Sequence, residues 1–226
     1  MADERYEASE RRPIASRERR SAKLVARWLA RRGVSANAIS VGGMVCGILA
    51  GVVLAATSHM PEFARWLWLA AATFVQLRLA ANMFDGMVAI ETGCASRMGE
   101  VYNEVPDRVS DAATLIGAGY AAGADVTLGY AAASVAIFVA YVRAMGKAAG
   151  AAQEFCGPMA KPHRMFVVTL FALYCGLAPR GWQPTWGAEP AWGIPAAGLA
   201  VIVVGGLVTA IRRLRRIART LRNPHL

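Results

Sequence analysis

Carboxylate and carboxamide side chains recur at regular spacing in the middle of the chain. Asn82 and Asp85 are three residues apart, and Asn103, Asp107 and Asp111 follow one another at intervals of four. On a helix, side chains three or four residues apart lie on one face. Two such faces, joined by a short turn, could surround a hard divalent cation through oxygen ligands. The alternative is that these groups form interhelical hydrogen bonds and an Asp–Arg pair, and the spacing alone leaves both interpretations open.

The elements that must position these residues are long apolar stretches. Six of them are each close to the ~20 residues that a helix needs to cross a bilayer. They run approximately over 38–57, 63–84, 105–123, 126–146, 164–179 and 192–211. Ionisable side chains cost at least ~2.5–3.5 kcal/mol each at mid-membrane, so those of the acidic region should face a polar cavity and have a role. We therefore expect an all-α fold, a polytopic bundle of six transmembrane helices.

The excess positive charge lies at the two ends of the chain. Ten of the 25 Lys and Arg residues lie in residues 1–35, against five acids, and six lie in 212–226 with no acid, while the middle holds nine bases and ten acids. A chain that is 56% hydrophobic is unlike a disordered basic tail, and it lacks the basic stripe of a nucleic-acid binder. Basic ends around a nearly neutral apolar body predict a multi-pass protein of the cell (inner) membrane with both termini in the cytoplasm.

The links between the six stretches agree with this orientation. The links near 58–62 and 124–125 contain no Lys or Arg, and the link at 180–191 contains Arg180 alone. The links on the other side are basic, with Arg97, Arg108, Arg143, Lys147, Lys161 and Arg164. By the positive-inside rule this second side is cytoplasmic, and the acidic region lies on it.

The chain divides into three parts. Residues 1–35 form a basic cytoplasmic segment, 36–211 the membrane domain, and 212–226 a basic cytoplasmic tail. Residues 17–32 place Leu24, Val25, Trp28 and Leu29 on one helical face. We expect an amphipathic helix in the interface of an anionic membrane, the alternative being a soluble amphipathic helix packed on the protein. Close helix packing is expected in the first stretch, at Gly43, Gly47 and Gly51.

Segment 82–107 has the sequence N-M-F-D-G-M-V-A-I-E-T-G-C-A-S-R-M-G-E-V-Y-N-E-V-P-D. It resembles the motif of the CDP-alcohol phosphotransferase (CDP-alcohol phosphatidyltransferase) family, D-x2-D-G-x2-A-R-x8-G-x3-D-x3-D, with every spacing preserved. The matched positions are Asp85, Gly86, Ala89, Gly99 and Asp107, and Ser96 fits a small hydroxyl residue often found there. Segments 35–40 and 141–144 resemble two further conserved regions of the family, so the resemblance covers most of the chain.

The resemblance implies an integral membrane enzyme of phospholipid biosynthesis. It would move a substituted phosphate, in the first place phosphatidyl from CDP-diacylglycerol, to an alcohol or phosphorylated alcohol and release CMP. It implies Mg²⁺ or Mn²⁺ at Asp85, Asn82, Asn103 and Asp107, with Asp107 also acting as the catalytic base that deprotonates the acceptor. It further implies a homodimer among membrane lipids, with the active site facing the cytoplasm and no nucleic-acid partner.

The resemblance also assigns two binding sets. The nucleotide would lie against Gly86, Ala89, Ser96 and Gly99. A phosphorylated acceptor would lie against Arg143, Lys147, Lys161, Arg164 and Arg108. For the basic set, the alternative is ordinary cytoplasmic charge that touches lipid headgroups. Asp111 either shifts the pKa of Asp107 by repulsion or pairs with Arg108.

Three positions depart from the family motif. Asn82 and Asn103 replace two aspartates, and Ile90 replaces an arginine whose phosphate contact Arg97, Arg108 or Arg78 would have to supply. The asparagines keep oxygen ligands but lower the formal ligand charge from −4 to −2, so we expect one metal ion in place of two. The chain is then either an active variant subgroup, which we favour, or a catalytically silent relative that binds lipid or a partner.

Overall fold

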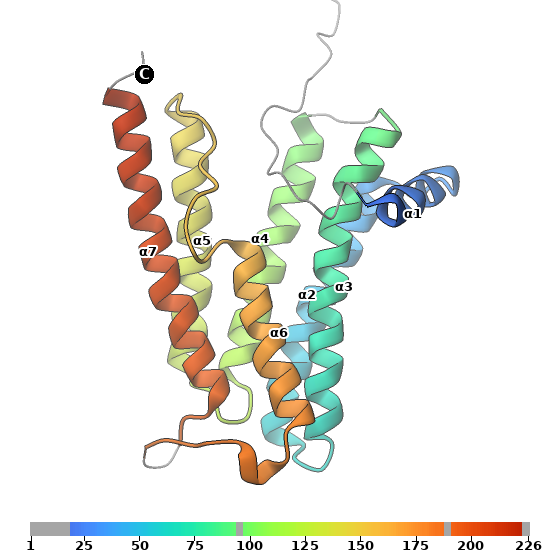
Figure 1. Ribbon diagram of the computed structural model, residues 1–226. Coiled ribbons are helices and arrows are strands. Elements are labelled where there is room, and N and C mark those ends of the chain that lie inside the picture. Colours follow the sequence, from blue (N-terminus) through green and yellow to red (C-terminus); the bar gives the residue numbers. More distant parts are fainter. Residues whose placement is uncertain (1–18, 94–96, 188–190, 223–226) are drawn as a thin grey trace, which may run out of the picture.

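The computed structural model describes residues 19–93, 97–187 and 191–222, apart from the side chains of Arg97, Met98 and Glu100. These residues form a helical bundle (Figure 1). The helices are α1 (Arg20–Arg31), α2 (Ala36–His59), α3 (Ala64–Glu91), α4 (Arg97–Gly119), α5 (Val126–Ala148), α6 (Lys161–Leu177), the 3₁₀ turn η2 (Arg180–Trp182) and α7 (Ile194–Arg222). Over these described ranges, β structure is limited to one bridge between Trp186 and Trp192. The prediction of an all-α fold is confirmed.

Each of the six expected apolar stretches lies largely within one of the helices α2 to α7. Four of these helices, α2, α3, α5 and α7, are long and apolar enough to cross a membrane. The other two differ for separate reasons: α4 carries much of the acidic region and has Pro106 inside it, whereas α6 has only 17 residues. The chain is thus a helical membrane protein with at least these four apolar helices.

Two helices extend beyond the apolar stretches that predicted them. Helix α3 continues to Glu91, so Asp85 lies on a helical extension rather than in a link. Helix α7 continues to Arg222, so residues 212–222 of the expected tail are helical. The extension of α7 is fixed by side chains that face the bundle. Arg213 donates to the carbonyls of Cys156 and Val139, and Ile217 belongs to a small buried cluster at the same end.

Helix α2 packs closely against α3 and α4. A Cβ on Gly51 would overlap the backbone of Ala113 in α4, and the hydroxyl of Thr114 donates to the carbonyl of Gly47 over 2.9 Å. Gly43 lies instead against Ala81 of α3. The predicted role of this glycine run in close helix packing is confirmed, and both partner helices come from the same chain.

The link between α5 and α6 descends along the bundle, so that α6 begins well below the neighbouring ends of α3 and α5 (Figure 1). This link is tied to α7, because the backbone N–H of Met159 donates to the hydroxyl of Thr209 over 2.9 Å and Arg213 donates to the carbonyl of Cys156. The first residue of α6, Lys161, is thereby held between helices rather than at the surface.

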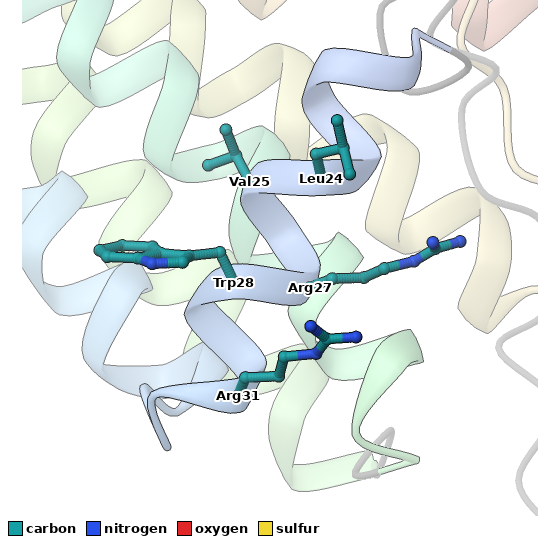
Figure 2. Close-up of a pocket in the computed structure, with 5 residues that line it drawn as sticks. All are labelled: Leu24, Val25, Arg27, Trp28 and Arg31. Carbon is teal, nitrogen blue, oxygen red and sulfur yellow. The ribbon is translucent and has the colours of Figure 1, made fainter.

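Helix α1 packs against α3, and its buried residues are two alanines, Ala22 and Ala26. Its large apolar side chains point the other way: Leu24 is 64% exposed and Trp28 is 54% exposed. Figure 2 shows Leu24, Val25 and Trp28 on the helix together with Arg27 and Arg31, which line a pocket with them. Leu24, Val25 and Trp28 are therefore exposed while α1 packs on α3 through its alanines, and its place in a membrane interface stays a prediction.

Candidate functional site

Asp85 is buried near the C-terminal end of α3, where only 4% of its surface is exposed. Ser40 of α2 donates its hydroxyl to Asp85 Oδ2 over 2.9 Å, and the backbone N–H of Gly86 donates to Oδ1. A buried carboxylate requires such donors, because leaving it unpaired away from water is costly. Both oxygens of Asp85 are therefore oriented by the protein.

Arg78 connects α3 to α4 at the next level of the bundle. Its guanidinium donates to Asp107 Oδ1 over 2.7 Å and to the hydroxyl of Ser110 over 2.9 Å, and it is only 2% exposed. Its NH2 group also lies 3.5 Å from Asp111 Oδ1. Arg78 is thus fully engaged in holding α4 and is not free to replace the missing phosphate contact at Ile90.

Asp111 makes an interhelical ion pair with α6. Arg164 lies 2.9 Å from Asp111 Oδ2, both side chains are buried, and Arg164 also donates to the carbonyl of Met159. Arg108, by contrast, donates to Glu104 one turn earlier in α4. The alternative in which Asp111 pairs with Arg108 is wrong, because Arg164 donates to Asp111 Oδ2 and the nearest guanidinium to Oδ1 is that of Arg78, at 3.5 Å. Asp111 therefore forms an ion pair that holds α4 and α6 together.

Lys161 brings its ammonium group between the oxygens of α3 and α4. Its Nζ forms an ion pair with Asp107 Oδ2 and donates to Asn82 Oδ1 over 3.0 Å, and its side chain is 13% exposed. Asp85 interacts electrostatically with both Asp107 and Lys161. Three of the four residues predicted to hold a metal, Asn82, Asp85 and Asp107, are therefore gathered around one lysine.

The fourth predicted metal ligand, Asn103, is exposed on α4 one turn before Asp107. Within the described part of the chain, its side chain forms no hydrogen bond with Asn82, Asp85 or Asp107. Among the described residues, no three His, Cys, Asp or Glu side chains are grouped as a metal site. The donor chemistry, two carboxylates and one amide oxygen, suits one hard divalent ion and does not suit two.

The predicted acceptor-binding bases fall into two groups. Arg143 of α5 and Arg108 of α4 each approach Glu104 Oε1 to 2.7 Å, and the Arg143 guanidinium lies over the ring of Phe155. Lys147 is exposed in the last turn of α5. Lys161 and Arg164 lie on α6 and instead pair with two acids of α4, Asp107 and Asp111. The structure therefore divides a set that the sequence treated as one.

The predicted nucleotide-binding residues lie beside the acidic cluster. Gly86 and Ala89 follow Asp85 on α3 and are partly exposed, as is Gly99 near the start of α4. Ser96 lies outside the described residues. Gly86 and Ala89 are small residues, and their role in nucleotide binding stays a prediction.

Two contributors to the site were not predicted from the sequence. Ser40 orients Asp85, and its only signal is its place at the end of segment 35–40. Arg213 fixes the link before Lys161 from the far side of the bundle, and within a basic segment it is indistinguishable from its neighbours. In the same link, burial raises the pKa of the Cys156 thiol, and the neighbouring Glu154 adds to this shift.

The sequence was compared with models of known protein families. The model described as CDP-alcohol phosphatidyltransferase matches residues 33–211. The chain belongs to the CDP-alcohol phosphatidyltransferase family. The match spans the helices α2 to α6 and most of α7, so it includes every element of the site. The predictions of the family and of a membrane-bound transferase of phospholipid biosynthesis are confirmed.

Individual relatives agree with this membership. The chain is 29% identical over 203 residues to a phosphatidylinositol phosphate synthase of Streptomyces avermitilis, covering 86% of this chain and 76% of the relative. It is 25% identical over 190 residues to the inner membrane protein YnbA of Escherichia coli, covering 84% and 87%.

Solved structures show the same fold. The phosphatidylinositol phosphate synthase of Mycobacterium tuberculosis with CDP-DAG bound superposes with a TM-score of 0.69 at 21% identity, covering 88% of this chain and 94% of that one. Its complex with manganese and citrate superposes with a TM-score of 0.68, covering 87% and 88%. At this identity the likeness is one of fold.

Proposed function

We propose that the protein transfers a phosphatidyl group from CDP-diacylglycerol to a phosphorylated alcohol and releases CMP. The observation that carries this proposal is the gathering of Asp85, Asn82 and Asp107 at the ends of α3 and α4, in a chain of this family. The phosphatidylinositol phosphate synthases among the relatives favour a sugar-alcohol phosphate, such as an inositol phosphate, as the acceptor.

In the proposed reaction the acceptor oxygen forms a bond to the β-phosphorus, and the bond from that phosphorus to the CMP oxygen breaks. Asp107 takes the proton of the acceptor hydroxyl. Gly86, Ala89, Ser96 and Gly99 accommodate the nucleotide. Because Arg78 holds one oxygen of Asp107 from behind, the carboxylate keeps a fixed orientation toward the site.

Asp85, Asp107 and Asn82 would hold one Mg²⁺ or Mn²⁺. When bound, such an ion neutralises negative charge on the diphosphate of the CDP-lipid. Its proposed presence is supported by the oxygen-only donor set and by the manganese complex of a protein with the same fold. Asn103, which is exposed, has a weaker claim as a ligand than the sequence gave reason to expect.

The acceptor phosphate is proposed to meet Arg143, Lys147 and Arg108 at the ends of α4 and α5. Arg143 and Arg108 share Glu104, which leaves this trio a net positive charge and holds two guanidinium groups ready for an anion. Lys161 and Arg164 of α6 are proposed to act on the phosphate indirectly, through their ion pairs with Asp107 and Asp111.

In the membrane, α2 to α7 are proposed to cross six times, with both termini and the site on the cytoplasmic side. The positive-inside bias of the links supports this orientation. Helix α1 is proposed to lie in the interface, with Leu24, Val25 and Trp28 toward the lipid and its arginines toward anionic headgroups. The homodimer rests on family resemblance alone, because α3 and α4 occupy the glycine face of α2 within the chain.

A second candidate, a catalytically silent lipid-binding relative, is favoured by the contact of Lys161 with Asp107 and Asn82. The test uses full-length protein in nanodiscs with CDP-diacylglycerol, Mn²⁺ or Mg²⁺, and a panel of alcohols and alcohol phosphates. We expect CMP release with at least one acceptor and its loss in Asp107→Asn. Glu62→Gln, an exposed carboxylate in the opposite link, is the matched control. Absence of CMP release with every acceptor would decide for the silent relative.

A further inference from the structure

The cluster at the ends of α3, α4 and α6 is electrically neutral without any bound ion. It contains three carboxylates, Asp85, Asp107 and Asp111, and three basic groups, Arg78, Lys161 and Arg164. All six side chains are buried or nearly so, and charges in such surroundings must be balanced.

Aspartates at positions 82 and 103, as in the family motif, would add two negative charges. One divalent ion balances two negative charges, so the two asparagines remove the charge that a second ion would require. Replacing two aspartates by asparagines and removing one divalent ion change the total charge of the site by equal and opposite amounts, so together they leave it unchanged.

The geometry places one positively charged group between the oxygens of the two helices. Lys161 Nζ forms an ion pair with Asp107 Oδ2 and donates a hydrogen bond to Asn82 Oδ1 over 3.0 Å, so one ammonium lies between an α3 oxygen and an α4 oxygen. An ammonium donates hydrogen bonds to the same carboxylate and amide oxygens that a hard cation would bind. The link 149–160 is tied to α7 and sets the start of α6 at this depth, which makes the position of Lys161 a property of the fold.

We propose that the Lys161 ammonium is a built-in cation that occupies the position of a second metal ion. The proposal rests on the proposed function for its purpose, which is to present a fixed positive charge to the diphosphate of the CDP-lipid. It makes Lys161 a positioning and charge-balancing residue of the acidic cluster, distinct from the Arg143 and Lys147 group on α5.

The test is Mn²⁺ binding to the detergent-solubilised full-length protein, measured by calorimetry and by the electron paramagnetic resonance signal of free Mn²⁺. We expect wild type to bind no more than one Mn²⁺ per chain. Lys161→Met should bind Mn²⁺ roughly tenfold more tightly or take up a second ion, because a nearby positive charge is removed. Lys161→Arg, which keeps the charge, and Lys23→Met, which removes a charge from exposed α1, should match wild type. Lys161→Met binding no more tightly than wild type, with the same stoichiometry, would overturn the proposal.

A double-mutant cycle gives a second measurement, and thermal unfolding shows whether each variant is folded. Asn82→Asp is introduced with and without Lys161→Met, and thermal unfolding is recorded for each protein. With Lys161 present, the new carboxylate pairs with the ammonium, so Asn82→Asp should strengthen Mn²⁺ binding less than it does in the Lys161→Met background. Equal effects in both backgrounds contradict the proposal.

Release of CMP is measured on the same preparations, so the two proposals fail separately. The expected Mn²⁺ results without CMP release from any acceptor would reject the transferase and leave the role of Lys161 standing. CMP release together with unchanged Mn²⁺ binding in Lys161→Met would support the transferase and reject the role of Lys161.

Discussion

At the scale of single residues, the site depends on side chains that orient its acids. Asp85, Asp107 and Asp111 each receive hydrogen bonds or ion pairs from a different helix: Asp85 from α2, Asp107 from α3 and α6, and Asp111 from α3 and α6. Because every acid is held from outside its own helix, the arrangement of the acids reports the packing of the whole bundle.

Ser40 offers the simplest test of this arrangement. Ser40→Ala removes the hydroxyl that donates to Asp85 Oδ2 and leaves the helix α2 intact. Partners that orient a ligand typically change metal affinity roughly 10–100-fold, so we expect weaker Mn²⁺ binding of that order and a parallel loss of CMP release. The matched control is Ser134→Ala, an exposed serine on α5, which should bind as wild type does. Unchanged Mn²⁺ affinity in Ser40→Ala would remove Asp85 from the ligand set.

The acids could be found from sequence because their spacing is local, and the family motif extends that knowledge to Asp107. The partners of these acids could not. Whether Asp111 pairs with Arg108 or with Arg164 depends on how α6 lies against α4, and the three-residue spacing of Arg108 and Asp111 within α4 favours the wrong arginine. Likewise Lys161 was grouped with Arg143 by charge, whereas the descent of the link before α6 separates them.

At the scale of elements, α2 is the helix around which α3 and α4 are positioned. The sequence predicted close packing at its glycine run, and the apolar stretch 38–57 lies inside it. The structure adds its beginning, where Ser35 caps the first turn by accepting from the N–H of Ala38. The helix ends of α3 and α7 were missed. Polar residues end an apolar stretch but need not end a helix, and the buried contacts of Arg213 and Ile217 continue α7 past the point where hydropathy falls.

The glycines of α2 provide a matched pair of variants. Gly51→Ala places a Cβ against the backbone of Ala113, which cannot move without shifting α4, whereas Gly42→Ala places it in open space. Overpacking of this kind costs typically 1–3 kcal/mol. We expect a lower unfolding temperature and reduced CMP release in Gly51→Ala, with Gly42→Ala equal to wild type or slightly more stable. Thermal unfolding in detergent measures both. Equal stability of the two variants would show that α2 and α4 do not approach this closely.

Helix α1 makes a second prediction at this scale. Its apolar face is exposed and its arginines flank that face (Figure 2), so an anionic bilayer should protect it. In nanodiscs we expect amide hydrogen exchange in α1 to slow when phosphatidylglycerol replaces phosphatidylcholine. Leu24→Glu together with Trp28→Glu should abolish that difference, while exchange in α5 stays constant. Exchange in α1 that ignores lipid charge and both substitutions would place the helix away from the membrane surface.

At the scale of the whole molecule, the two ends of the bundle differ in composition. The end with α1 and the last turn of α7 carries the acidic cluster and most of the bases (Figure 1). The opposite end carries Trp182, Trp186 and Trp192, all exposed, and Arg180 donates there to the carbonyl of Pro61. Aromatic side chains gather at membrane interfaces, and bases remain on the cytoplasmic side. The tryptophan-rich end is therefore expected to face the other side of the membrane.

This orientation can be tested on the intact chain in a bacterial host. A green fluorescent protein fused after Leu226 should fluoresce, because it folds only in the cytoplasm, and alkaline phosphatase inserted after Gly181 should be active, because it needs the oxidising side. Exchanging the two reporters should silence both. Lys or Arg residues added beside Arg180 should lower the phosphatase activity, because the positive-inside rule disfavours basic links on the non-cytoplasmic side. Crossings by α2, α3, α5 and α7 alone would make α3 and α5 run in opposite directions through the membrane, whereas in the bundle they run in the same direction (Figure 1). In the bundle the helices α2 to α7 alternate in direction. Active phosphatase at Gly181 together with a fluorescent C-terminus requires an odd number of crossings between the two reporters, and α7 supplies one.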